Sequence, residues 1–252
     1  MKLNNKRTIL VGLAFLSICA FWQMYDSIVP LILTKTFHMN ETFSGAIMAA
    51  DNILALFLLP FFGSVSDKSH SKLGKRMPFI LFGTGCAIIL MNILPLLDNS
   101  YAAQPSGFKT ASFVIVLGLL LVAMGTYRAP AVALMPDVTP KPLRSRANAI
   151  INLMGAVGGI LYLGVAAVLY PNSKTAGLDH VNYQPLFIVV SAIMFVAVAV
   201  LFLTIREPKL TAENQALEKQ HPEWNLAQDD GSGHQTLPKL ALIHISEPTR
   251  PY

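Results

Sequence analysis

Charged side chains are scarce in this sequence. Asp, Glu, Lys and Arg make up 13% of its 252 residues, whereas 53% are hydrophobic. Soluble domains carry about 25% charged residues, so the composition excludes an ordinary soluble domain and indicates an integral membrane protein. The formal net charge of +5 does not indicate nucleic-acid binding, because the basic residues lie in short loops between apolar runs, a pattern typical of cytoplasmic loops.

Cysteine and histidine are also few. The two cysteines, Cys19 and Cys86, fall inside apolar runs and are interpreted as small buried hydrophobic residues, not as a disulfide or metal ligands. His38, His70 and His180 are scattered without paired metal-ligand spacing. We therefore expect no metal and no cofactor. An integral-membrane enzyme is disfavoured, because it would need a nucleophile or a metal constellation.

Apolar runs long enough to cross a bilayer are abundant, and each crossing needs about 20 mostly apolar residues. Six segments qualify, at about 8–33, 42–65, 77–97, 111–135, 147–169 and 185–205. The first run is too long for the apolar region of a signal peptide, and no small-residue cleavage site follows it. The sequence predicts an all-α membrane protein with six transmembrane helices within residues 1–205.

The placement of Lys and Arg predicts the side of the membrane on which each loop lies. With the N-terminus inside, the outer loops hold Lys35, Lys109 and Lys174. The inner flanks hold twelve basic residues, namely Lys2, Lys6, Arg7, Lys68, Lys72, Lys75, Arg76, Lys141, Arg144, Arg146, Arg206 and Lys209. This bias predicts that both termini are cytoplasmic, and we expect a multi-pass protein of the plasma membrane.

The composition changes after the last apolar run. Residues 206–239 are polar and rich in Glu and Asp, which predicts a cytoplasmic segment that is helical over about 212–220. Residues 242–250 read Leu-Ile-His-Ile-Ser-Glu-Pro-Thr-Arg and look like a translated sequencing adapter. We interpret 240–252 as an artefact of that kind and expect the natural protein to continue beyond about Lys239.

Three ionisable side chains lie inside the predicted spans: Asp26, Asp51 and Arg128. Such residues are costly in a bilayer and usually face a cavity or a partner. Asp51 lies about 15 Å deep, near the midplane, whereas Asp26 lies toward the outer end and Arg128 in the inner third. Asp51, and secondarily Asp26, are candidate proton or cation sites; the alternative is a structural ion pair or hydrogen bond. Arg128 could bind a substrate hydroxyl, pair with a carboxylate or reach toward the cytoplasm.

Other polar side chains within the spans are candidate substrate contacts. Trp22, Gln23 and Tyr25 form an aromatic and polar patch of the kind that holds sugars, although Trp22 could also belong to an aromatic belt at the membrane surface. Asn148 and Asn152 lie one turn apart on one helix face. They either line a cavity or hydrogen-bond to a neighbouring helix.

The most specific pattern is the loop between the second and third runs. Gly63 is followed by Asp67-Lys68 and then by Gly74-Lys75-Arg76. This spacing resembles the loop signature of the major facilitator superfamily. The long form, with Pro-Phe-Ile at residues 78–80, resembles the branch of sucrose carriers and glycoside–cation symporters. Residues 125–130 and 137–148 resemble the same branch, and the resemblance covers about residues 8–205, one six-helix half of a twelve-helix fold.

The resemblance implies two inverted three-helix repeats, with a substrate cavity at the midplane between two halves. Helices one, two, four and five would face the cavity, and helices three and six the lipid. Asp67 would help to close the cytoplasmic side against the other half. Gly63 is expected to let two helices approach closely. Lys75 and Arg76 would serve topology, contact with anionic lipid or the gate itself.

These observations and the resemblance together predict a secondary active transporter that couples a proton or sodium ion to symport of a sugar or glycoside. Its partners would be that substrate, the cation, the lipid bilayer and a missing C-terminal six-helix half. Two alternatives stay open. The first is a drug or metabolite exporter of the same superfamily, and the second is a six-helix protein that acts only as a dimer.

Overall fold

The computed structural model describes residues 3–175, 177–178, 180–222 and 224. The part so described contains six helices long and apolar enough to cross a membrane, which confirms the predicted all-α, six-helix fold. They are α1 (Asn5–Leu31, continued by the π-helical turn η1, Ile32–Thr36), α2 (Glu41–Asp67), α3 (Met77–Ala103), α4 (Gly107–Val138), α5 (Arg144–Leu169, preceded by the 3-10 turn η2, Lys141–Leu143) and α7 (Gln184–Thr204).

Several helices extend beyond the apolar runs that predict them. α3 continues through Asp98 to Ala103, and α4 begins at Gly107. The short turn between them is fixed by Lys109, whose Nζ donates hydrogen bonds to the carbonyl oxygens of Ser100 (2.7 Å) and Gln104 (2.8 Å). The lysine thus adds a second donor to the Ser100 carbonyl, which already accepts from the Gln104 N–H, and satisfies the Gln104 carbonyl just beyond the end of α3.

Two shorter helices complete the described part. α6 (Asn172–Thr175) is a single turn in the connection between α5 and α7. α8 (Glu207–Gln220) follows the last span and begins five residues before the predicted helix 212–220, because Pro208 occupies its first turn and Glu207 supplies an acidic N-terminal side chain. The proposed artefact at 240–252 lies outside the described residues.

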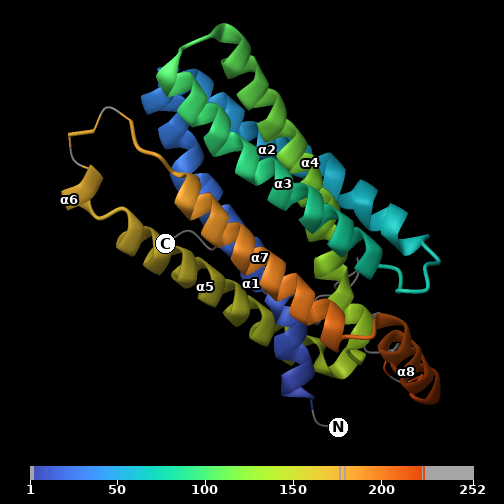
Figure 1. Ribbon diagram of the computed structural model, residues 1–252. Helices are drawn as coiled ribbons and strands as arrows, with labels where there is room; N and C mark the ends of the chain where they lie inside the picture. The colour runs from blue at the N-terminus through green and yellow to red at the C-terminus, as the bar shows by residue number, and fades with distance from the viewer. Residues whose placement is uncertain (1–2, 176, 179, 223, 225–252) are drawn as a thin grey trace, which may run out of the picture.

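The six spans pack as a bent row (Figure 1). α1 packs along α5 and α7, α7 also packs along α3, and α4 joins α3 to α2. α2 and α5 are therefore the two ends of the row, and α2 is the least buried span. α3 and α7 pack against each other, away from those ends. α1 and α4, which touch each other directly, line the inner side of the bend.

Close backbone contacts hold the row together. A Cβ atom on Gly158 of α5 would lie 2.0 Å from the carbonyl oxygen of Leu16 on α1, so only glycine permits this approach. Between α1 and α4, the buried hydroxyl of Tyr127 donates to the carbonyl oxygen of Ala14 (3.0 Å) and contacts the Ser17 hydroxyl (2.5 Å). These contacts fix the helices that carry the candidate site.

Candidate functional site

A narrow crevice opens between α1, α2 and α4. Trp22 contributes from α1, Asp51 from α2 and Arg128 from α4, so three of the predicted site residues meet there although they are far apart in sequence. The rest of the lining is mainly apolar and consists of Leu54, Ala55, Leu58, Leu59, Leu121 and Gly125. The crevice holds only about 20 Å³ within this chain, so its polar groups form one wall of a site and not a complete small-molecule pocket.

The polar groups of the crevice touch each other at one corner. The guanidinium carbon of Arg128 lies 5.6 Å from the centre of the Trp22 ring, within the range of a cation–π interaction. The Trp22 ring also meets Tyr25 edge to face, with ring centres 5.3 Å apart. This contact argues against an isolated belt role for Trp22, since its ring is packed inside the bundle.

Buried polar atoms at this corner have no hydrogen-bond partner among the described residues. They are the indole nitrogen of Trp22, the hydroxyl of Tyr25 and one carboxylate oxygen of Asp51. Leaving such a group unpaired costs about 1–3 kcal/mol. A ligand hydroxyl in the crevice could pair with the indole donor and the carboxylate acceptor, because Trp22 and Asp51 line it, whereas Tyr25 is fully buried and does not.

The other candidates lie around the crevice at different distances. Asp26 is exposed, and it lies close enough to Asp51 for the two carboxylates to interact electrostatically. Gln23 is half-buried against α5, with its side-chain oxygen 3.8 Å from the Cβ position of Gly159. Asn148 and Asn152 are exposed on α5, and the structure does not bring them to the crevice.

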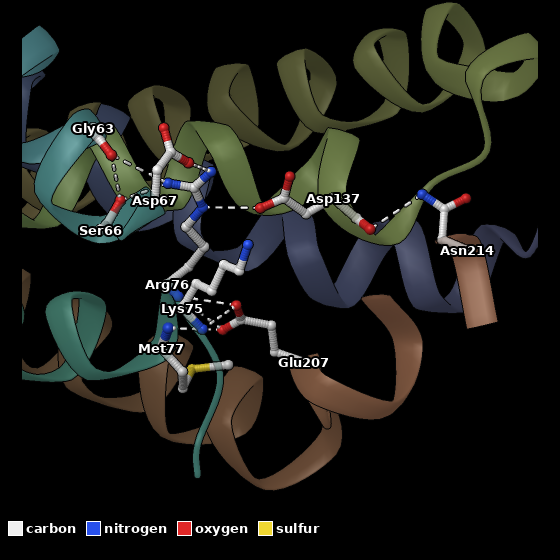
Figure 2. A network of polar contacts seen from close by, with 9 residues as sticks. All are labelled: Gly63, Ser66, Asp67, Lys75, Arg76, Met77, Asp137, Glu207 and Asn214. Carbon is white, nitrogen blue, oxygen red and sulfur yellow. Dashed lines mark hydrogen bonds and ion pairs between the residues drawn. The ribbon is translucent and has the colours of Figure 1, made fainter. Parts of the chain in front are cut away.

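The second predicted feature, the segment from Gly63 to Arg76, forms a charged cluster at one end of the bundle (Figure 2). Arg76 is buried, and its guanidinium pairs with Asp67 of α2 and with Asp137 of α4, the latter at 2.8 Å. It also donates to the Ser66 hydroxyl (2.5 Å) and the Gly63 carbonyl oxygen (3.4 Å). One side chain therefore ties together the ends of α2 and α4.

Burial by itself would lower the pKa of Arg76. The hydrogen bonds and negative charges of Asp137 and Asp67 outweigh burial, so its pKa lies above the ordinary value and the charge is retained. The two carboxylates differ in exposure, since 60% of the Asp67 side chain is accessible but only 29% of that of Asp137. The carboxylate of Asp67 is therefore accessible to a protein segment that packs on this end of the bundle.

Glu207, which sequence reasoning missed, completes the cluster from α8. Its buried carboxylate accepts hydrogen bonds from the backbone N–H groups of Lys75 (2.7 Å), Arg76 (2.9 Å) and Met77 (2.8 Å). It caps the N-terminus of α3, where the helix dipole favours negative charge. No local pattern reveals this role, because Glu207 lies 130 residues after Met77 and resembles only the first residue of α8.

α8 is held against the bundle by further polar contacts. The Asn214 amide donates to the carbonyl oxygen of Asp137 (3.1 Å), and Arg144 at the start of α5 pairs with Glu218 (3.0 Å). The helix therefore bridges the ends of α3, α4 and α5. The polar segment after the last span is in this way part of the same cluster.

The two signature glycines have different roles. Gly74 adopts a positive φ of 111°, and a Cβ atom there would lie 2.4 Å from the Glu207 carboxyl group, so glycine is required on both counts. No other helix of the described residues approaches Gly63, since no atom lies within 4 Å of its Cβ position, and the predicted close approach stays a prediction. Gly63 instead contributes its carbonyl oxygen to Arg76. Lys68 and Lys75 have exposed side chains.

Replacing Glu207 with Gln should destabilise the protein by about 1–3 kcal/mol, because the cap loses its charge and one of its two acceptor oxygens. The measurement is equilibrium unfolding in mixed detergent micelles. Glu213→Gln is the matched control, since Glu213 is a more exposed carboxylate on the same helix whose ion pairs are 3.8 Å and 4.0 Å long. Equal stability of the two variants would contradict the capping role.

Comparison with known proteins gives consistent matches. The sucrose transport protein SUC3 of Arabidopsis thaliana is 35% identical over 158 residues, which cover 58% of this chain and 26% of that protein. The sucrose transport protein SUT3 of Oryza sativa subsp. indica is 36% identical over 154 residues, or 56% and 30% of the two chains. Human solute carrier family 45 member 3 is 25% identical over 186 residues, or 72% and 34%.

These matches span about a quarter to a third of the length of the relatives. Residues 11–245 match the family model of the Major Facilitator Superfamily. That match covers most of the sequence and includes all six spans except the first turns of α1. Together with the fold and the loop signature, it shows that the chain belongs to the Major Facilitator Superfamily.

Proposed function

We propose that this protein is a secondary active transporter that couples a proton or sodium ion to symport of a sugar or glycoside by alternating access. The observation that carries the proposal is the crevice in which Asp51, Arg128 and Trp22 meet beside Tyr25. The similarity to proteins named for sucrose transport supports the sugar class.

The chemistry of the crevice fits a sugar. The half-buried ring of Trp22 can pack against the apolar face of a pyranose ring, while its unpaired indole N–H hydrogen-bonds to a hydroxyl. Arg128 adds charged donors from α4. Asp51 supplies a carboxylate in a largely apolar surround, where it can bind and release a proton or contact a cation.

Alternating access requires a second wall for this crevice. In the proposal, a C-terminal six-helix half packs against the open side between α2 and α5, and the Arg76 cluster lies on the cytoplasmic side with the N-terminus. The exposed edge of Asp67 then meets the other half when that side is closed. Plasma-membrane localisation belongs to the same proposal, and the cytoplasmic N-terminus follows from the predicted charge bias.

The substrate class is tested by transport assays on the complete gene product. We expect uptake of one or more members of a panel of disaccharides and glycosides into cells, and uptake that depends on a proton or sodium gradient. Gradient-driven efflux of lipophilic cations without sugar uptake would establish the exporter alternative instead. The expected preference follows from the mixture of aromatic and hydrogen-bonding groups around Asp51.

The dimer alternative is tested separately. The 252-residue chain is expressed alone, and its oligomeric state is measured by chemical crosslinking in the membrane. We expect it to transport nothing, since α2 and α5 end the row without closing a two-sided cavity. Crosslinked dimers that accumulate a sugar would show that two copies complete the pathway.

A further inference from the structure

A second buried carboxylate lies far from the crevice, at the end of the bundle opposite to Arg76. Asp98 is fully buried near the end of α3, and its carboxylate interacts with the Thr36 hydroxyl but forms no well-aligned hydrogen bond among the described residues. Among the residues that the structure describes, no Lys or Arg forms an ion pair with Asp98. The basic side chain that faces it is His180, whose Nε2 lies 3.8 Å from the nearer oxygen of Asp98.

His180 belongs to the connection between α5 and α7, and both of its ring nitrogens have polar neighbours. Nε2 lies 2.9 Å from the side-chain oxygen of Asn99, and Nδ1 lies 3.3 Å from the hydroxyl of Thr36 in the π-helical end of α1. The Asn99 oxygen can only accept, so Nε2 carries a proton. A second proton on Nδ1 would be donated to the Thr36 oxygen, and the imidazolium would then face the buried carboxylate.

The same connection is fastened to α3 by neutral hydrogen bonds. The Asn99 amide donates to the side-chain oxygen of Asn182 (2.9 Å), which also accepts from the backbone N–H of Gln184 at the start of α7 (2.9 Å). The Tyr170 hydroxyl donates to the Asn182 carbonyl oxygen (2.7 Å). His180 and Asp98 are thus the titratable pair inside a network that joins α1, α3 and α7.

We propose that Asp98 and His180 form a proton-binding site that locks the α5–α7 connection onto α3 and the π-helical end of α1. With one proton bound, the pair is either neutral or a compensated ion pair. Loss of that proton leaves a buried negative charge without a partner, which is strongly unfavourable. The site does not depend on which substrate the protein transports.

Polar side chains from three elements surround the pair, and one of them is titratable. Tyr183, at the start of α7, interacts electrostatically with Asp98, and burial is the main cause that raises the pKa of this phenol, so it is neutral near pH 7. Thr36 of η1 lies beside both members of the pair. α3 contributes Asn99, which is not titratable. The proton in question therefore belongs to the Asp98–His180 pair.

The sign of the pH effect follows from proton linkage. An unfolded chain releases the histidine proton near pH 6.5 and the aspartate proton near 3.9. In the proposal, the burial of Asp98 beside His180 keeps one proton on the folded pair. The folded state then binds more protons than the unfolded state. The folding equilibrium constant should therefore fall as the pH rises from 7 to 8, by up to about tenfold for one proton.

The test compares the wild-type chain with Asp98→Asn, which keeps the shape but cannot ionise. Unfolding equilibria of the purified 252-residue chain in mixed micelles are measured at pH 6, 7 and 8. In Asp98→Asn, the folding equilibrium constant should fall less between pH 7 and 8 than it does in the wild type. The difference between the two proteins should reach up to about tenfold. Glu41→Gln, which removes an exposed carboxylate at the start of α2 at the same end of the bundle, should retain the wild-type slope.

A second measurement needs no unfolding. Diethylpyrocarbonate modifies neutral imidazoles, and peptide mass spectrometry separates His180 from the exposed His70. In the wild type, His180 should become reactive at a higher pH than His70, and in Asp98→Asn the two should become reactive over the same pH range. Identical unfolding slopes in wild type and Asp98→Asn, with both histidines reactive over the same pH range in each protein, would overturn the proposal.

Discussion

Replacing Asp51 with Asn should abolish uphill accumulation of the transported sugar. Asn keeps the size and hydrogen-bonding capacity of the side chain, but it neither binds a proton nor carries the negative charge that attracts sodium. Sugar binding and downhill exchange should persist, because Trp22, Tyr25 and Arg128 are unchanged around the crevice. The accumulation ratio in proteoliposomes with an imposed cation gradient should therefore fall to its equilibrium value.

The control for this experiment is Glu41→Gln, which removes an exposed carboxylate from the same helix outside the crevice. It should accumulate sugar as the wild type does. Exchange of labelled for unlabelled sugar, measured without a gradient, shows whether the Asp51→Asn variant is folded and binds substrate. Wild-type accumulation by Asp51→Asn would refute the coupling role of this residue and leave Asp26 as the candidate coupling carboxylate.

Replacing Arg76 with Met should give the largest loss of stability. The substitution keeps a long buried side chain but removes the charge that holds Asp67 and Asp137 together. Breaking a fully buried pair costs about 3–5 kcal/mol, and the partial exposure of both carboxylates reduces the expected loss here to about 2–3 kcal/mol. Unfolding in mixed micelles measures this loss.

Arg76→Lys distinguishes a planar, forked contact from simple charge. A lysine ammonium cannot reach Asp67, Asp137 and Ser66 in the arrangement that the guanidinium adopts, so Lys should recover only part of the lost stability. Full recovery with Lys would mean that charge alone matters. If the Met variant is as stable as the wild type, the cluster does not hold the ends of α2 and α4 together.

The spans and part of the crevice were predictable because each depends on local sequence. A run of about 20 apolar residues has few alternatives to a spanning helix. Charged residues in such runs are costly, so Asp51 and Arg128 are candidate functional residues from the sequence alone. Their meeting with Trp22 required the packing of three helices, which composition alone does not specify.

Other features were not predicted from the sequence, and each has a physical reason. Asp98 follows the last apolar residue of its run and appeared to lie in a loop, yet α3 continues past it and buries it completely. Asn148 and Asn152 share a helix face as predicted, but that face is exposed in this chain. Glu207 acts on a helix end 130 residues away from it, a relation that no sequence window contains.

The most direct test of the account asks whether transported sugar occupies the crevice. In the complete gene product, with Cys19, Cys86 and any further native cysteine replaced by Ala, a single cysteine is placed at Ala55 in the crevice or at the exposed Ala103. Its reaction with N-ethylmaleimide is followed with and without the transported sugar. Sugar should slow labelling at position 55 and leave labelling at position 103 unchanged. Equal labelling rates at position 55 with and without a sugar that is transported would contradict it.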